Sequence, residues 1–300
     1  VNGHSVEGLQ DRLRALDADL PLVMQEGTAH TPRVNFSMAY ATQFGSTLRD
    51  KAHDVLLDKQ NQLVFVTGLT DGIFVEESRS SSNGASTDML VAAFHASTGA
   101  RLWARQLGDG SVCSGRSLAL DDSHTRLFVA GFTEGALFRP AAQTPLVYDT
   151  ALGCFDAATG ALLWGAQSTL PLSDTAAAVH VVGDASVGEA LVVVVGRVNT
   201  QAASAQGNVT DDVDAVVTVH NARDGVELSS TTFGTDAKDA VLSSVLDRER
   251  MVVYVVGSTH GARGAAGGSE VESDAGVLQR LVDGAMEDFG GRRGPGGMYA

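Results

Sequence analysis

The chain has 300 residues, and its 36 acidic side chains against 21 basic ones give a net charge of −15. A chain of this length can bury about three quarters of its unfolded surface, and 44% hydrophobic with 19% charged residues is a globular composition. The acidic balance disfavours nucleic-acid binding, and no apolar run approaches the roughly 18 residues of a membrane helix. Two cysteines exclude a disulfide-stapled scaffold and a thiolate zinc site.

Residues 1–34 form an N-terminal extension in which a short helix is predicted. Four leucines recur at helical spacing between Ser5 and Leu20, and Pro21 ends the pattern. Because the polar face carries both charge signs, we expect the helix to pack on the rest of the protein and not on a membrane surface. The chain starts at Val1 without a basic-then-apolar segment, which we interpret as a mature product or an excised piece.

A repeat of about 60 residues dominates residues 35–289. Three kinds of marker keep this period: a glycine that ends an apolar run, an aspartate that opens another alternating segment, and a glycine in a turn. Their steps are 63, 65 and 61 residues, then 61, 65 and 60, then 61 and 65. The markers are Gly68, Gly131, Gly196 and Gly257; Asp88, Asp149, Asp214 and Asp274; and Gly99, Gly160 and Gly225. They define units at about 43–105, 106–166, 167–231 and 232–289.

Each unit is predicted to contain four strands. The run that ends at each marker glycine, such as residues 63–68 (LVFVTG), is apolar on both faces, as a strand covered on both sides must be. Short strands with no convincing helix between them favour an all-β fold over βαβ units. The expected fold is a β-propeller, in which each blade is a four-stranded antiparallel sheet covered on both faces by its neighbours.

Four blades are visible, and two interpretations of their total number stay open. In one, a leading strand at residues 35–42 (NFSMAYAT) pairs with the last blade and closes a ring. In the other, which we favour, the chain is part of a longer propeller. Residues 290–300 are then a glycine-rich linker or the start of a further repeat.

A compact turn joins the third and fourth strands of each unit. The first two turns are residues 95–99 (HASTG) and 156–160 (DAATG), where a polar side chain accepts backbone N–H bonds and glycine supplies a positive φ. Four residues after each turn glycine come Trp103 and Trp164, the only tryptophans of the chain. A ring at this position is expected to cover the boundary between two blades.

These residues resemble two families of propeller repeats. Residues 93–103 (AFHASTGARLW) and 154–164 (CFDAATGALLW) resemble the tryptophan-docking motif of the quinoprotein, or PQQ-like, repeats. The period, with strands that end in TGLTDG (67–72) or AGFTEG (130–135), is similar to the bacterial seven-bladed propeller repeat called SBBP. The resemblance covers about residues 37–289. It implies the propeller fold and little about function, because such motifs hold blades together.

No sequence pattern indicates a catalytic centre, so no catalytic residue, cofactor or metal ligand is predicted. There is no Gly-x-Ser-x-Gly elbow and no pair of histidines at a metal-ligand spacing. Cys113 and Cys154 are expected to be buried free thiols, with a disulfide between them as the alternative. Asp211, Asp212 and Asp214 carry the oxygen atoms that calcium favours, but they lack the spacing of an EF-hand loop and are interpreted as a solvated acidic loop.

The inner strands of a propeller converge on its central channel, where one ligand site is expected. Counting 14 residues back from the marker glycines, with two more for the third unit, gives Asp54, Ser117, His180 and Ser243. The hypothesis is that these side chains form a polar ring facing the channel. The alternative is that they are ordinary solvated residues.

Two classes of function are considered. We expect a non-catalytic binding or structural module, whose blade loops or central channel recognise a protein or a small molecule. The alternative, implied by the resemblance, is a relative of the quinoprotein dehydrogenases, which use pyrroloquinoline quinone with calcium; no residue is carried over as catalytic. Sequons at Asn35 and Asn208 are compatible with an extracellular or cell-surface protein.

Overall fold

A computed structural model describes residues 40–74, 86–139, 147–168, 170, 173–185, 190–203, 209–235 and 238–259, with the backbone alone at 201–203 and 209–212. These ranges contain strands and turns but no helix, and hence no helix that could cross a membrane. The helix expected within residues 1–34 and the linker expected at 290–300 lie outside the described residues. Of the leading strand expected at residues 35–42, only 40–42 are described, and they are not in a strand.

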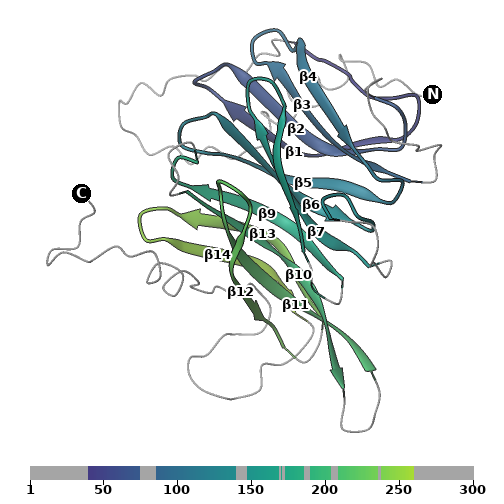
Figure 1. Cartoon of the computed structure of the whole chain (residues 1–300), viewed down its shortest axis with the longest axis vertical. Coiled ribbons are helices and arrows are strands. Elements are labelled where there is room, and N and C mark those ends of the chain that lie inside the picture. The colour runs from purple at the N-terminus through teal and green to yellow at the C-terminus, as the bar shows by residue number, and fades with distance from the viewer. Residues whose placement is uncertain are drawn as a thin grey trace, which may run out of the picture. The chain divides into compact units, whose positions relative to one another are not determined.

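The strands form separate antiparallel sheets, and in each sheet they follow one another in chain order (Figure 1). The first sheet contains β1 (Asp50–Asp58), β2 (Leu63–Thr70), β3 (Asp88–His95) and β4 (Arg101–Leu107). The second contains β5 (Cys113–Leu120), β6 (Arg126–Thr133), β7 (Asp149–Asp156) and β8 (Leu162–Gln167). The third contains β9 (Asp174–Val182), β10 (Leu191–Ala203), β11 (Val209–Asn221) and β12 (Glu227–Phe233). In the part that is described, the fourth unit is the hairpin of β13 (Asp239–Asp247) and β14 (Val252–Thr259).

Consecutive sheets pack face to face through apolar interfaces that we call seams. In the first seam, between the first and second sheets, Phe65, Met89, Leu127 and Phe155 have no exposed surface. The second and third seams continue this packing and include, respectively, Phe128, Leu152, Val192 and Val194, and Val195, Val217, Val253 and Val255. The second and third sheets are thus buried on both faces, which is why their middle strands are apolar throughout. This is the β-propeller arrangement of four-stranded blades that the repeat predicts.

A β-bulge at the same place in every inner strand explains the marker glycines. In β1 the register passes from Ala52 to Asp54, so that His53 is an extra residue opposite β2. The strands β5, β9 and β13 pair with their neighbours through the same irregularity. At the second bulge, a methyl group on Gly131 would lie 1.9 Å from the carbonyl oxygen of Ser114. Only a hydrogen atom fits there, so the strand opposite each bulge needs glycine at this position of every unit, and the strand continues beyond it.

The two tryptophans lie across the first and second seams and contact the turn of the next sheet. Trp103 Nε1 donates a 3.1 Å hydrogen bond to the carbonyl oxygen of Ala157, and Trp164 Nε1 donates a 3.2 Å bond to that of Ala222. A methyl group on Gly160 would come within 2.5 Å of the Trp103 ring, and the φ angle of Gly160 is +70°. The turn therefore needs glycine both for its backbone angle and for the space that the ring takes.

Tyr40 takes the same place against the first turn of the first sheet. Its hydroxyl donates a 2.8 Å hydrogen bond to the carbonyl oxygen of Ala96, and its ring lies against Gly99. Tyr40 precedes Trp103 by 63 residues, which is one repeat. The segment before β1 therefore reproduces the outer-strand contact of a unit, although its described residues are not in a strand.

We predict that Gly131→Ala lowers the free energy of unfolding by about 2–3 kcal/mol, because the new methyl group displaces the backbone of β5. Urea titration followed by circular dichroism measures the change. The matched control is Gly135→Ala, whose methyl group would meet movable side-chain atoms of Asp109 and Ser111. Equal losses in the two variants would contradict the role assigned to the bulge.

We predict that Trp103→Ala costs about 3–5 kcal/mol of folding free energy and that Trp164→Ala costs less. Trp103 is 8% exposed, whereas Trp164 is only partly buried. Each variant keeps one tryptophan, so its fluorescence during urea unfolding reports the seam that was not altered. The reverse order of stabilities would show that the second seam depends more on its ring than the first.

Candidate functional site

The expected channel residues bridge neighbouring inner strands. Asp54 Oδ2 accepts a 2.8 Å hydrogen bond from the N–H of Leu118, and Ser117 Oγ accepts a 3.2 Å bond from that of Val179. His180 Nε2 lies 2.8 Å from Ser244 Oγ on β13. The hydrogen bonds of these three side chains are partly buried, whereas Ser243 is exposed. The structure thus gives three of the four residues a role between blades, and a polar ring that faces a channel stays a prediction.

The strand register aligns Ala178, and not His180, with Asp54 and Ser117. Asp54 and Ser117 directly follow the extra residue of their bulge, and Ala178 follows Ala177 in the same way. The sequence-based count back from Gly196 stopped at His180, two residues short of Ala178. The reason is that the β9–β10 connection, residues 183–190, is longer than the β1–β2 connection of the first unit, residues 59–62. His180 supplies the bridge that the methyl side chain of Ala178 cannot make.

The cysteines and the bulge histidine are held in forms with little reactivity. Cys113 and Cys154 are free, as expected, and lie in the first and second seams, on opposite faces of the second sheet. Burial raises the pKa of Cys113 to about 11 and that of Cys154 to about 12, so both thiols stay protonated and weakly nucleophilic. Burial lowers the pKa of His53, whose Nδ1 lies 2.8 Å from the carbonyl oxygen of Gly115 and therefore carries the proton of the neutral ring.

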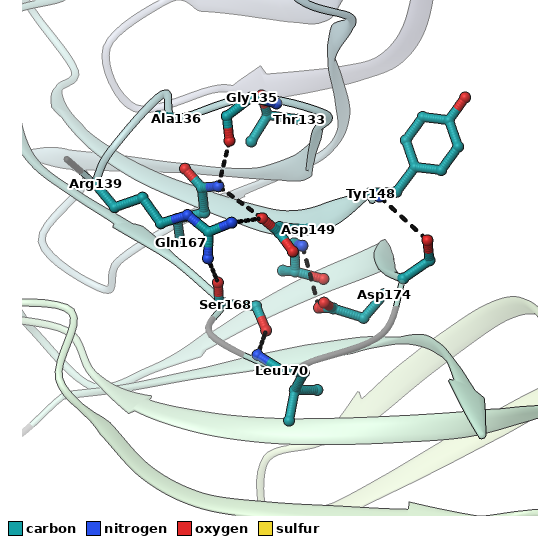
Figure 2. Close-up of polar contacts among 12 residues, drawn as sticks. Thr133, Gly135, Ala136, Arg139, Tyr148, Asp149, Gln167, Ser168, Leu170 and Asp174 are labelled. Carbon is teal, nitrogen blue, oxygen red and sulfur yellow. Dashed lines mark hydrogen bonds and ion pairs between the residues drawn. The ribbon is translucent and has the colours of Figure 1, made fainter. Parts of the chain in front are cut away.

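A glutamine near the end of each of the first two outer strands ties the marker aspartate to the loop that precedes it. Gln167 Nε2 donates to Asp149 Oδ2 at 2.9 Å and to the carbonyl oxygen of Gly135 at 2.7 Å (Figure 2). Its Oε1 accepts from the N–H of Phe138 at 3.1 Å. Gln106 makes the matching three contacts in the first sheet, to Asp88, Gly72 and Phe74. These glutamines were not predicted from the sequence, although their spacing of 61 residues repeats the period.

We call these glutamine contacts the glutamine clamps. Beside the clamp of Gln167 lies a buried carboxylate with an unsatisfied oxygen. Asp174 opens β9, is 3% exposed, and accepts a 3.1 Å hydrogen bond at Oδ2 from the N–H of Thr150 (Figure 2). Its Oδ1 has no hydrogen-bond partner among the described residues. Burial, with a smaller contribution from the nearby Asp149 carboxylate, raises the pKa of Asp174 to about 6. The group is therefore mostly ionised at neutral pH, in surroundings that stabilise its charge poorly.

Asp174 is part of the wall of a cavity of about 280 Å³ in the second seam. The remaining wall comes from β7, β8, β10, β11 and the start of β12. Its polar part includes Thr150, Gln167, Ser168, Thr218, His220 and Glu227, and its apolar part includes Leu152, Ala166, Leu170, Val194 and Val216. The cavity is thus apolar on one part of its wall and carries hydrogen-bonding groups and a carboxylate on another.

The cavity exists because small and polar residues replace the large ones of the first seam. Counting from the marker aspartates, Thr150 takes the place of Met89 and His220 takes that of Phe155. Counting from the tryptophans, Ala166 takes the place of Arg105 and Ser168 that of Leu107. Met89 and Phe155 are fully buried in the first seam, and Leu107 packs against them. The site was not predicted from the sequence, because spacing alone does not show which positions of two units face each other.

His220 faces this cavity as a neutral ring. Its Nδ1 lies 3.2 Å from the carbonyl oxygen of Gly225, which can only accept, so Nδ1 carries the proton. Its Nε2 then accepts from the hydroxyl of Thr218, 2.9 Å away. Burial lowers the pKa of His220, which agrees with the neutral form. The ring adds no positive charge to the cavity.

No three His, Cys, Asp or Glu side chains in the described ranges gather as metal ligands would. The side chains of Asp211 and Asp212, part of the expected acidic loop, lie outside the described residues. A second cavity of about 250 Å³ lies on the outer face of the first sheet, where Phe44, Asp50 and Val66 are part of its wall. It corresponds in register to the first cavity, since Asp50 opens β1 as Asp174 opens β9.

No protein-family profile and no curated protein matches the chain. Among solved structures, it is similar to a quinohemoprotein alcohol dehydrogenase from Comamonas testosteroni, at 16% identity over 71% of this chain and 29% of that chain, with a TM-score of 0.40. It is also similar to the Dos1 propeller, at 10% identity over 68% of this chain and 65% of that chain, with a TM-score of 0.28. The dihydro-heme d1 dehydrogenase NirN gives 11% identity over 86% of this chain and 61% of that chain, with a TM-score of 0.26.

The chain spans less than a third of the length of the alcohol dehydrogenase. Because these three TM-scores lie below 0.5, the propeller fold rests on the sheets and seams of this chain itself.

We predict that Asp174→Asn changes how stability depends on pH. The pKa of Asp174 is about 6 in the folded protein against 3.8 in an unfolded chain, so the folded state binds the proton more tightly. Its contribution to stability therefore grows as the pH falls from about 6 towards 4, by at most about 3 kcal/mol. Urea unfolding at pH 7.5 and pH 4.5 should show that the variant loses this gain.

Asp156→Asn is a control of opposite sign, because hydrogen bonds from Thr159 lower the pKa of Asp156. That variant should lose stability relative to the native chain at both pH 7.5 and pH 4.5, and the loss should disappear only below the pKa of 3.8 that the carboxyl has in an unfolded chain. An identical pH profile for Asp174→Asn and the native chain would contradict the assignment of a buried, ionised Asp174.

Proposed function

We propose that the protein is a non-catalytic β-propeller module that binds a small molecule in the cavity of the second seam. The observation that carries this proposal is the buried carboxylate of Asp174, with one unsatisfied oxygen, on the wall of a cavity that the first seam fills. An unfilled cavity and an unpaired buried charge both cost stability. A ligand that fills the space and contacts the carboxylate would offset both costs.

The reactive side chains described above support binding over catalysis. The two thiols are protonated and packed in seams, and His53 is held by a carbonyl oxygen. Asp54, Ser117 and His180 bridge neighbouring strands. Because the cavity wall belongs to the second and third sheets, the proposed site lies between two blades. From the sequence, we expected recognition at the blade loops or the central channel.

A quinoprotein-like dehydrogenase is the alternative function. Calcium beside a quinone takes six to eight oxygen ligands, and the described residues bring no three acidic or histidine side chains together. They therefore do not fit this pair of cofactors. The remaining support for the alternative is the resemblance of the tryptophan turns to PQQ-like repeats. We likewise propose that the units are repeats of the PQQ-like kind, from these turns, or of the SBBP kind, from the period and the strands that end in TGLTDG or AGFTEG. The two sequons support a secreted or cell-surface location, which we likewise propose.

A thermal-shift screen tests the proposed function. The native chain is heated with small alcohols, polyols, amines and carboxylates, and with pyrroloquinoline quinone plus calcium. We expect at least one small-molecule class to raise the melting temperature of the native chain and not that of Ala166→Leu, which fills the cavity and removes no polar group.

The matched control is Leu163→Met, because Leu163 is 47% exposed on the same strand and should leave ligand binding unchanged. Ala166→Leu should itself be as stable as the native chain or more so, as a cavity-filling change. The proposal fails if no compound stabilises the native chain, or if Ala166→Leu responds equally. Saturable quinone binding with oxidation of an alcohol or a sugar would favour the dehydrogenase.

A further inference from the structure

The charge of the second-seam cavity is negative on the described part of its wall. Asp174 and Glu227 contribute carboxylates, and no lysine or arginine belongs to the wall. His220 is neutral, with both ring nitrogens occupied by Gly225 and Thr218. A cation is therefore the partner that the electrostatics of this cavity favour.

One described cation beside the cavity, Arg139, is already paired. The guanidinium of Arg139 forms an ion pair with Asp149 through Nη2, and its Nη1 donates a 3.0 Å bond to the carbonyl oxygen of Ser168. Figure 2 shows this guanidinium directed at Asp149, with Asp174 beyond it. Asp149 thus has its counter-ion, whereas Asp174 receives hydrogen bonds from Thr150 and Ser168 and forms no ion pair in the part of the chain that the structure describes.

The apolar wall decides which kind of cation fits. Leu152, Val194 and Val216 present hydrocarbon. The described residues also bring no three acidic or histidine side chains together, as the ligands of a calcium ion would be. The cavity of about 280 Å³ is also much larger than a bare ion. An ammonium group on a short alkyl chain satisfies both parts of the wall, because its N–H groups can donate to Asp174 while the chain packs on the valines.

We propose that this cavity binds a small alkylammonium ion, whose charged group pairs with the carboxylate of Asp174 and whose alkyl chain packs against Leu152, Val194 and Val216. The inference rests on the proposed function and specifies its ligand class. Asp174 then acts as the specificity-determining residue, and the replacements at Thr150, Ala166 and Ser168 provide the room.

Calorimetric titration at pH 7.5 tests the ligand class with three probes of similar size: n-butylammonium, butan-1-ol and butyrate. We expect n-butylammonium to bind the native chain at least tenfold more tightly than butan-1-ol, and butyrate not to bind. Asp174→Asn should weaken n-butylammonium at least tenfold and leave butan-1-ol within about twofold. Ala166→Leu should abolish the binding of both.

Asp239→Asn is the matched control, since Asp239 opens β13 as Asp174 opens β9. It should bind n-butylammonium like the native chain, and circular dichroism should show that all variants are folded. Equal binding of n-butylammonium and butan-1-ol, or an unchanged affinity in Asp174→Asn, overturns the ligand class and leaves the proposed function standing. Binding that Ala166→Leu retains overturns the cavity as the site, and with it both proposals.

Discussion

The structure depends on one constraint: a sheet that is apolar on both faces must be covered on both. The second and third sheets satisfy it by packing against neighbours through the seams, where side chains such as Phe128 and Val195 are fully buried. The inner strands approach each other closely enough for Asp54 and Ser117 to reach the backbone of the next sheet. Packing and polar bridges together fix the relation of each blade to the next.

Because each seam is built from its own residues, one seam can change while its neighbours keep their packing. The first seam is filled by Met89 and Phe155, and the corresponding places in the second seam hold Thr150 and His220. The tryptophan at the outer end of the first seam and the tryptophan at the outer end of the second make the same hydrogen bond to the turn of the next sheet. The repeat therefore keeps the packing of the blades constant, and a departure from it at a few positions opens the second-seam cavity beside Asp174.

Periodic features of the chain were predictable from the sequence, and features that depend on register were not. The marker glycines located the second strand of each unit, because a glycine needed opposite every bulge recurs at every period, although each strand continues beyond its glycine. His180 was placed level with Asp54 because the length of the β9–β10 turn could not be derived from spacing alone. The cavity was not foreseen, since Thr150 is unusual only once its counterpart Met89 is known to be buried.

The glutamine clamps have a consequence for how this scaffold can diversify. Gln167 holds the carbonyl oxygen of Gly135 and the N–H of Phe138, so the first residues beyond β6 are pinned to the edge of their own sheet. Gln106 does the same for Gly72 and Phe74 beyond β2. Insertions or deletions in the connections that follow Phe74 and Phe138 therefore need not move the strands. The connection of one blade can thus be lengthened or replaced without changing how the other blades pack.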